Sequence, residues 1–339
     1  MNNETCIIIV LVIIIFFLSC VIICKCKEKE IRLCLQKCNE FFQNKRRHFI
    51  KKTENFTNTQ DFDIEERIKY YLGNNKKKTF VKLYNQNLGK DVYIINTYSL
   101  DGSIENNNIL KEMITFYKEF LRENIQNRDN QIILNTGKFY HKVPYVALSR
   151  PIKNKGLVSI LPFNNIKHWR PIENLKKYDI PYESKRNVII WRGTNKGEQR
   201  RKLIEKYHNY PSHEIDIKDC KFFIPELLQN KFILSIEGND VASNLKWIMA
   251  SNSLCIKPQS TKESWLMEGK LKPWVHYVPV KGDFSDLEEI YKWCIENPEI
   301  CKGIIKNAND YISRFMNGDT EFKIIKRILK EYCNNTSIL

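Results

Sequence analysis

The pattern of hydrophobic and polar positions divides the chain into three parts. Residues 6–24 form an apolar run without any charged side chain, and as a helix such a run spans roughly 28 Å, close to the hydrocarbon thickness of a bilayer. Residues 25–60 are basic and rich in Asn. From residue 61 onward, short apolar runs alternate with amphipathic segments, as in a globular protein. We therefore predict a membrane anchor at residues 1–24, a basic juxtamembrane stalk at 25–60 and a folded region beyond it.

The first part of the folded region contains both helices and strands. Apolar periodicity predicts helices at residues 64–72, 109–124 and 172–178, and strands at residues 91–98, 131–137, 145–150 and 160–163. Together these elements predict an N-terminal α/β domain at residues 61–180.

Between residues 187 and 280, strands and helices alternate, which predicts a parallel sheet with right-handed crossovers. We expect strands at 187–191, 213–217, 231–238, 254–258 and 274–280, and helices at 198–208, 225–230 and 242–253. Three amphipathic helices follow, at 286–297, 299–315 and 321–333. The predicted fold class is α/β, with two Rossmann-like domains facing a cleft. The second domain covers residues 181–300, and C-terminal helices at residues 301–339 close the fold.

Charge and cysteine spacing narrow the choice of partners. The formal net charge of +16 attracts anions such as nucleic acid, lipid headgroups or phosphorylated small molecules. Nucleic acid is the weakest of these, because the basic clusters at 45–47 and 76–78 lack interleaved aromatic residues and no zinc-finger or helix-turn-helix spacing occurs. The eleven cysteines lack the spacing of a zinc site. We therefore predict no nucleic-acid partner and no metal.

The flanks of residues 6–24 favour an uncleaved, single-pass anchor in the lipid bilayer. The preceding residues, MNNET, contain no Lys or Arg, and the run is longer than the apolar core of a signal peptide. Lys25, Lys27 and Lys29 follow immediately, and the positive-inside rule would keep the folded region in the cytoplasm. An enzyme of the Golgi type needs the lumenal orientation instead, so both sides stay open.

A first candidate binding segment follows the strand expected at 187–191. The strand leads into a turn formed by Arg192, Gly193 and Thr194, and a helix begins near Gly197. Ligands of open α/β sheets bind beyond the carboxyl ends of strands, and a helix N-terminus favours a phosphate. The Thr194 hydroxyl and Arg200 or Arg201 are therefore candidates for binding a diphosphate. The alternative is a surface loop with solvated arginines, because neither a P-loop nor a G-x-G-x-x-G motif is present.

The same strand–loop–helix arrangement recurs after the strand expected at 231–238. Two such helix starts at one sheet edge can hold two parts of one nucleotide. Glu263 either binds ribose hydroxyls or caps a helix. The candidate binding residues of this segment are Gly238, Asn239, Asp240, Val241, Ala242, Ser243, Asn244, Lys246 and Glu263.

Five sequence blocks occur in a characteristic order in the second half of the chain. They are WRGT-x5-R at 191–200, LSIEGNDVASNLKW at 234–247, ASNSL at 250–254, ESW at 263–265 and LKPWVHYVPV at 271–280. Together they resemble glycosyltransferase family 90, over residues 125–315. The resemblance implies a GT-B-like fold, with an acceptor-side domain at 61–180 and a donor-side domain at 181–300. It also implies metal-independent, inverting transfer of a hexose or pentose, glucose or xylose, to a hydroxyl of a glycan or protein. The resemblance further implies a UDP-sugar as co-substrate and no other cofactor.

The resemblance assigns roles to individual residues. Thr194 matches the hydroxyl residue that contacts the donor diphosphate, and Arg200 matches the arginine that neutralises it. Residues 239–244 match the nucleotide-binding loop and helix start. Asp129 takes the place of the catalytic aspartate, which removes the proton from the attacking hydroxyl. Metal-dependent transferases use Asp-x-Asp instead; that pattern occurs at 61–63, where it directly precedes a helix and is interpreted as its cap.

Two positions depart from the family pattern. Asn244 stands where the family usually has an arginine, and Lys138 stands where it usually has a second aspartate. The first change bears on donor binding, for which Lys246 or Arg201 are candidate substitutes, and the second bears on acceptor recognition. The change at Asn244 motivates an alternative function, that of an inactive relative which binds sugar nucleotide or glycan without turnover.

The block LKPWVHYVPV predicts a strand bracketed by Pro273 and Pro279. We expect Trp274 and Tyr277 to pack in the core beside the donor pocket. His276 either reaches a phosphate or is a core histidine with internal hydrogen bonds, and the second interpretation is favoured.

Overall fold

The computed structural model describes residues 64–74, 79–81, 92–95, 100–101, 132–135, 144–153, 155–161, 170–221 and 223–338. All of them belong to one compact unit, residues 58–339. The predicted anchor, the stalk, the helix expected at 109–124 and the candidate base Asp129 lie outside the described residues. Within the described ranges, no helix has the length and apolar character needed to cross a bilayer.

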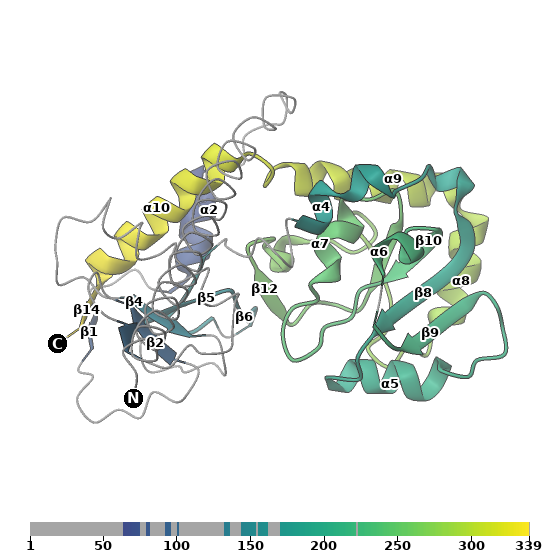
Figure 1. Ribbon diagram of the computed structural model, residues 1–339, viewed down its shortest axis with the longest axis horizontal. Coiled ribbons are helices and arrows are strands. Elements are labelled where there is room, and N and C mark those ends of the chain that lie inside the picture. The colour runs from purple at the N-terminus through teal and green to yellow at the C-terminus, as the bar shows by residue number, and fades with distance from the viewer. Residues whose placement is uncertain are drawn as a thin grey trace, which may run out of the picture. The chain divides into compact units, whose positions relative to one another are not determined.

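A five-stranded sheet in the second half of the chain is parallel throughout, in the order β13-β11-β10-β8-β9 (Figure 1). Its strands are β8 (Arg186–Gly193), β9 (Ile215–Asp219), β10 (Asn230–Leu234), β11 (Leu254–Lys257) and β13 (Val278–Pro279). Ile189, Phe232, Leu234, Leu254 and Ile256 are fully buried in one hydrophobic cluster. The alternation of strands and helices along the sequence therefore predicted the parallel sheet correctly.

The helices of this half are α4 (Arg170–Glu173), α5 (Glu198–Tyr207), α6 (Ile224–Leu227), α7 (Asn244–Met249), α8 (Leu287–Glu296), α9 (Pro298–Ser313) and α10 (Gly318–Asn335). The three predicted C-terminal helices are confirmed, with ends that differ from the prediction by one to three residues. Helix α7 is shorter than predicted and ends at Met249. The backbone N–H groups of Asn252 and Ser253, which a longer helix would use, donate instead to the Asp179 carboxylate at 2.7 Å and to the Ser251 hydroxyl at 3.1 Å.

The strand predicted for residues 274–280 is mostly wrong, since β13 contains only Val278 and Pro279. The preceding residues form a tight turn in which Trp274 N donates to the carbonyl oxygen of Tyr277 at 2.8 Å. Trp274 has φ +63° and is 46% exposed, with its ring edge-on to that of Trp293 at 4.8 Å. Tyr277 is buried, as predicted.

A second five-stranded sheet has the order β3-β2-β4-β5-β7. Strand β2 (Val92–Ile95) is antiparallel to β3 (Leu100–Asp101) and β4 (Ile132–Asn135). Strands β4, β5 (Tyr145–Ala147) and β7 (Val158–Ile160) are parallel. Two shorter pairs join β6 (Ser149–Pro151) to β12 (Lys262–Ser264) and β1 (Thr79–Val81) to β14 (Thr336–Ile338). The predicted α/β class is thus confirmed.

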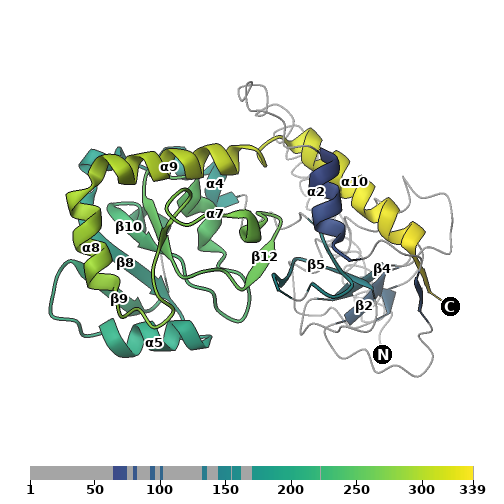
Figure 2. The ribbon, with the colours of Figure 1, turned by 180° about the vertical axis from the view of Figure 1, so that it is seen from behind.

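Helix α2 (Ile64–Leu72) packs beside α10, and Figure 2 shows the two side by side. The buried guanidinium of Arg67 pairs with Glu321 of α10 at 2.6 and 2.8 Å, and it lies over the ring of Phe315 at 4.6 Å. This ion pair joins residues from the two ends of the described chain.

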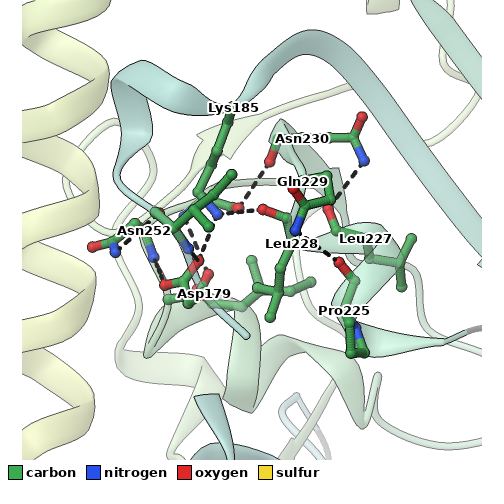
Figure 3. Close-up of polar contacts among 12 residues, drawn as sticks. Asp179, Lys185, Pro225, Leu227, Leu228, Gln229, Asn230 and Asn252 are labelled. Atoms are coloured by element: carbon green, nitrogen blue, oxygen red, sulfur yellow. Dashed lines mark hydrogen bonds and ion pairs between the residues drawn. The ribbon is translucent and has the colours of Figure 1, made fainter. Parts of the chain in front are cut away.

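A polar cluster holds the amino ends of β8, β10 and β11 together (Figure 3). The buried ammonium of Lys185 donates to Asp179 at 2.5 Å and to the carbonyl oxygen of Leu228. The other oxygen of Asp179 accepts from Asn252 N at 2.7 Å. The amide of Asn230 donates to two carbonyl oxygens at the end of α6. The cluster fixes the strand starts, at the edge opposite to the strand ends that follow in the next section.

Candidate active site

The loops after β8 and β10, which contain many of the predicted binding residues, lie at the carboxyl edge of the parallel sheet. The chain runs from β8 to β9 on one side and then returns to β10 on the other, so the strand order reverses between β8 and β10. Ligands of open α/β sheets bind in the crevice outside the strand ends at such a switch point. The loops after β8 and β10 are therefore the natural walls of a binding crevice.

Two glycines allow these loops to touch. Gly197 has φ +109°, and a Cβ atom there would lie 3.1 Å from the Cα atom of Gly238. A Cβ atom on Gly238 would lie 3.0 Å from Cζ of Arg200 and 3.0 Å from the carbonyl oxygen of Lys196. Glycine is needed where backbones approach each other this closely. The approach places the loop after β10 directly against the start of α5.

Arg200 lies at this junction, in the first turn of α5. Its guanidinium donates to the carbonyl oxygen of Ile236 at 3.0 and 3.3 Å and to that of Thr194 at 3.4 Å. Its Cζ atom lies 5.9 Å from the centre of the Trp191 ring. Burial lowers the pKa of Arg200, and no carboxylate among the described residues pairs with it. Among the described residues, the junction thus carries a positive charge without a paired carboxylate, and the neighbouring Thr194 is exposed.

The loop after β10 is fixed by its own polar contacts. Gly238 N donates to the carbonyl oxygen of Asp240 at 3.1 Å. The Asp240 carboxylate accepts from the Ser149 hydroxyl at 2.5 Å, and the Asn239 carbonyl accepts from Lys262 Nζ at 2.9 Å. Further along, Val241 and Ser243 are half-buried and Ala242 is buried. The loop is therefore held in place before any ligand arrives.

Asn244 is the first residue of α7, and its side-chain amide is engaged in hydrogen bonds within the fold. Its amide donates to the carbonyl oxygen of Leu234 at 3.1 Å and accepts from the Ser235 hydroxyl at 3.0 Å. Both contacts fasten the end of β10 to α7. Asn244 therefore supplies no charge at the position where the resemblance leads us to expect an arginine.

Arg192 and Gly193, at the end of β8, make contacts that stabilise the fold. The Arg192 guanidinium donates to the Asp216 carboxylate at 2.5 Å and to its carbonyl oxygen at 2.9 Å, on the neighbouring strand β9. A Cβ atom on Gly193 would lie 2.7 Å from the ring of Trp191. Arg192 is consequently occupied by Asp216, and Gly193 makes room for the indole.

Lys246 and Glu263 are occupied in buried ion pairs. Lys246 Nζ lies 2.6 Å from Glu268, and both side chains are buried. Glu263 lies 2.8 Å from Arg150 Nε, with both side chains fully buried, and 3.3 Å from Lys155 Nζ. Buried charges need such partners. The structure therefore places neither residue as a free group for a nucleotide, and Glu263 does not cap a helix but lies in β12.

One polar residue beside the junction was not among the predicted ones. Lys257, at the end of β11, lines a small pocket together with Gln199, Ser235, Glu237 and Glu268. The sequence did contain a signal for Lys257, because the residue lies at the carboxyl end of the strand predicted at 254–258. In the part of the chain that the structure describes, no three His, Cys, Asp or Glu side chains gather as a metal site would require.

Comparison with known proteins agrees with the sequence blocks. The model of Glycosyl transferase family 90 matches residues 156–338, more than half of the chain. The O-glucosyltransferase LpsA of Dichelobacter nodosus is 36% identical over 202 residues, covering 56% of this chain and 62% of that protein. Protein O-glucosyltransferase 2 of Danio rerio is 24% identical over 169 residues, covering 44% of this chain and 33% of that protein.

A viral protein is also similar. Uncharacterized protein 179R of Invertebrate iridescent virus 6 is 30% identical over 162 residues, covering 45% of this chain and 13% of that protein. The chain spans less than two thirds of the length of each of these relatives. Because the family model covers more than half of the chain and includes the whole junction of β8, β10 and α5, this protein belongs to glycosyl transferase family 90.

Proposed function

We propose that this protein is a membrane-anchored, inverting glycosyltransferase that moves a hexose or pentose from a UDP-sugar to a hydroxyl of a glycan or protein. The observation that carries the proposal is the meeting of Thr194, Arg200 and Gly238 at the point where the strand order reverses. Glucose is the first candidate, because two of the similar proteins are named O-glucosyltransferases, and xylose is the second.

The charge at the junction fits the leaving group of such a transfer. When the sugar leaves UDP, negative charge develops on the diphosphate, and a preorganised positive group there lowers the barrier. Arg200 is held by the carbonyl oxygens of Ile236 and Thr194 rather than by a carboxylate, so its charge is available to a phosphate. In this proposal Arg200 stabilises the leaving group without a metal ion.

The acceptor hydroxyl needs a base that takes its proton as it attacks the anomeric carbon. We assign this role to Asp129. The acceptor would bind on the side of residues 61–180 and the donor on the side of residues 181–300, as in a GT-B arrangement. Residues 6–24 would anchor the enzyme in the bilayer next to its acceptor.

A second candidate function is binding of a sugar nucleotide without turnover. It is favoured by Asn244, whose side chain is bound to Leu234 and Ser235 and offers no charge to a phosphate. Both candidates predict that UDP binds, and they differ in whether the sugar bond is broken.

The test is a UDP-release assay on the full chain in detergent, with a panel of UDP-sugars and simple acceptors. We expect release from UDP-glucose, and we expect Asp129→Asn to abolish release while UDP binding stays unchanged. UDP binding without release from any UDP-sugar would support the second candidate. A fully active Asp129→Asn variant would refute the assignment of the base.

A further inference from the structure

Lys257 is a buried lysine without an ion-pair partner among the described residues. Only 3% of the surface of Lys257 is exposed. Its Nζ atom donates to the carbonyl oxygen of Pro258 at 2.9 Å and lies 4.1 Å from the centre of the Tyr277 ring. An ammonium group is costly to bury when no opposite charge compensates it. A residue of this kind calls for an explanation that the fold itself does not supply.

The charged groups around Lys257 do not neutralise it by contact. Glu268 is already paired with Lys246 at 2.6 Å. Glu237 accepts from the backbone and hydroxyl of Thr261 at 2.9 and 2.5 Å. Burial raises the pKa of the neighbouring Cys255 to about 12, so its thiol is neutral at physiological pH. Burial likewise lowers the pKa of Lys257, although Glu237 and Glu268 act in the opposite direction.

The position of Lys257 connects it to the junction at Arg200. Ile256 is the register partner of Leu234, and Ser235 N donates to the carbonyl oxygen of Ile256 at 2.9 Å. Lys257 is thus at the carboxyl end of the strand next to β10. The pocket that it lines is also lined by Gln199, the residue before Arg200.

The pocket has room for about one water molecule. A single phosphate oxygen is of that size, so one oxygen can reach the ammonium while the rest of a diphosphate stays at the mouth of the pocket. Among the residues that line this pocket, Ser235 and Glu237 follow β10, and Pro258 and Ser260 follow β11.

We propose that Lys257 is a second cationic contact for the diphosphate of the sugar-nucleotide donor, beside Arg200. This inference rests on the proposed function. It assigns to β11 the positive charge that Asn244 does not provide, and it explains why a lysine is buried here without an ion pair to any carboxylate of the described residues. The bound phosphate oxygen is the missing counter-ion.

The test compares Lys257→Met and Lys257→Gln with wild type in the full chain, using UDP, uridine and inorganic pyrophosphate as probes. Removing one charge-assisted hydrogen bond weakens binding roughly 10- to 100-fold. We expect that loss for UDP and pyrophosphate and no change for uridine. We also expect the melting temperature of the ligand-free variants to stay the same or rise, because an uncompensated buried charge is removed. Lys292→Met, which removes an exposed lysine of α8, is the matched control and should change neither property.

The outcomes separate this inference from the proposed function. If wild type binds UDP and both Lys257 variants bind UDP and pyrophosphate equally well, the inference is wrong and the proposed function stands. A ligand-free melting temperature that falls in both variants, with unchanged pyrophosphate affinity, would show a structural role only. If wild type binds pyrophosphate through Lys257 but does not bind UDP, the proposed donor is wrong and the anion contact stands. If wild type binds neither probe, both are overturned.

Discussion

The guanidinium of Arg200 lies against the backbone of Gly238, so closely that a Cβ atom at Gly238 would come within 3.0 Å of Arg200 Cζ. The two residues belong to different strand–loop–helix units of the parallel sheet. Their contact brings the start of α5 and the loop after β10 together. In the proposed donor site, a diphosphate at this place would lie next to the positive charge of Arg200 and the backbone of Gly238.

Gly238→Ala should therefore damage the crevice. The new methyl group must displace the Arg200 guanidinium or the Lys196 backbone, and such overpacking costs about 1–3 kcal/mol of unfolding free energy. We expect weaker UDP binding together with this loss of stability, measured by titration calorimetry and urea unfolding. Gly303→Ala in α9 is the control. Nothing lies within 4 Å of a Cβ atom there, and this change should stabilise the protein by about 1 kcal/mol.

Arg200→Ala should reduce the rate of sugar transfer by roughly 10²–10³-fold, the usual effect of removing one preorganised group that stabilises developing charge. Arg200→Lys should keep only part of the wild-type rate, because an ammonium group lacks the planar, bidentate hydrogen-bonding geometry of a guanidinium. The neighbouring, exposed Arg201 provides the control. Equal losses in Arg200→Ala and Arg201→Ala would show that general surface charge, rather than the junction, attracts the donor.

The polar cluster at the amino ends of the strands should matter for stability and not for the donor. Lys185→Met leaves the Asp179 carboxylate without its buried cation, and breaking a buried pair costs about 3–5 kcal/mol. We expect that loss in urea unfolding, with unchanged UDP affinity of the folded protein. Lys306→Met breaks an exposed ion pair with Asp310 and should have little effect. A changed UDP affinity in Lys185→Met would contradict the separation of the two sheet edges.

His276 should make the stability depend on pH. Burial, Arg314 and Lys272 lower the pKa of His276 to about 4, and its Nδ1 atom accepts from Lys272 N at 3.0 Å. Below about pH 6.5, the ordinary pKa of histidine, His276 binds a proton in the unfolded state but stays neutral in the folded state until the pH approaches 4. Stability is then full above pH 6.5 and falls as the pH drops toward 4. Urea unfolding at pH 7 and pH 5 should show a smaller loss for His276→Asn than for wild type; equal losses would refute this.

The periodicity of the sequence was enough for most of the parallel sheet, because its buried strands are short apolar runs between amphipathic helices. The prediction failed at Trp274, because the tight turn there depends on a left-handed backbone conformation at a non-glycine residue. The hydrophobic pattern contains no signal for such a conformation. The roles of Lys246 and Glu263 could not be read either, since their partners Glu268 and Arg150 are known only once the chain is folded. The sequence did predict that Thr194, Arg200 and Gly238 lie close together, because the carboxyl ends of parallel strands share one sheet edge.

The most direct test of the binding crevice is a crystal structure of the full chain with UDP. We predict diphosphate oxygens within hydrogen-bond distance of the Arg200 guanidinium, at the junction between Thr194 and Gly238. UDP bound at another place on the protein, or bound there without contact to Arg200, would contradict the proposed donor site.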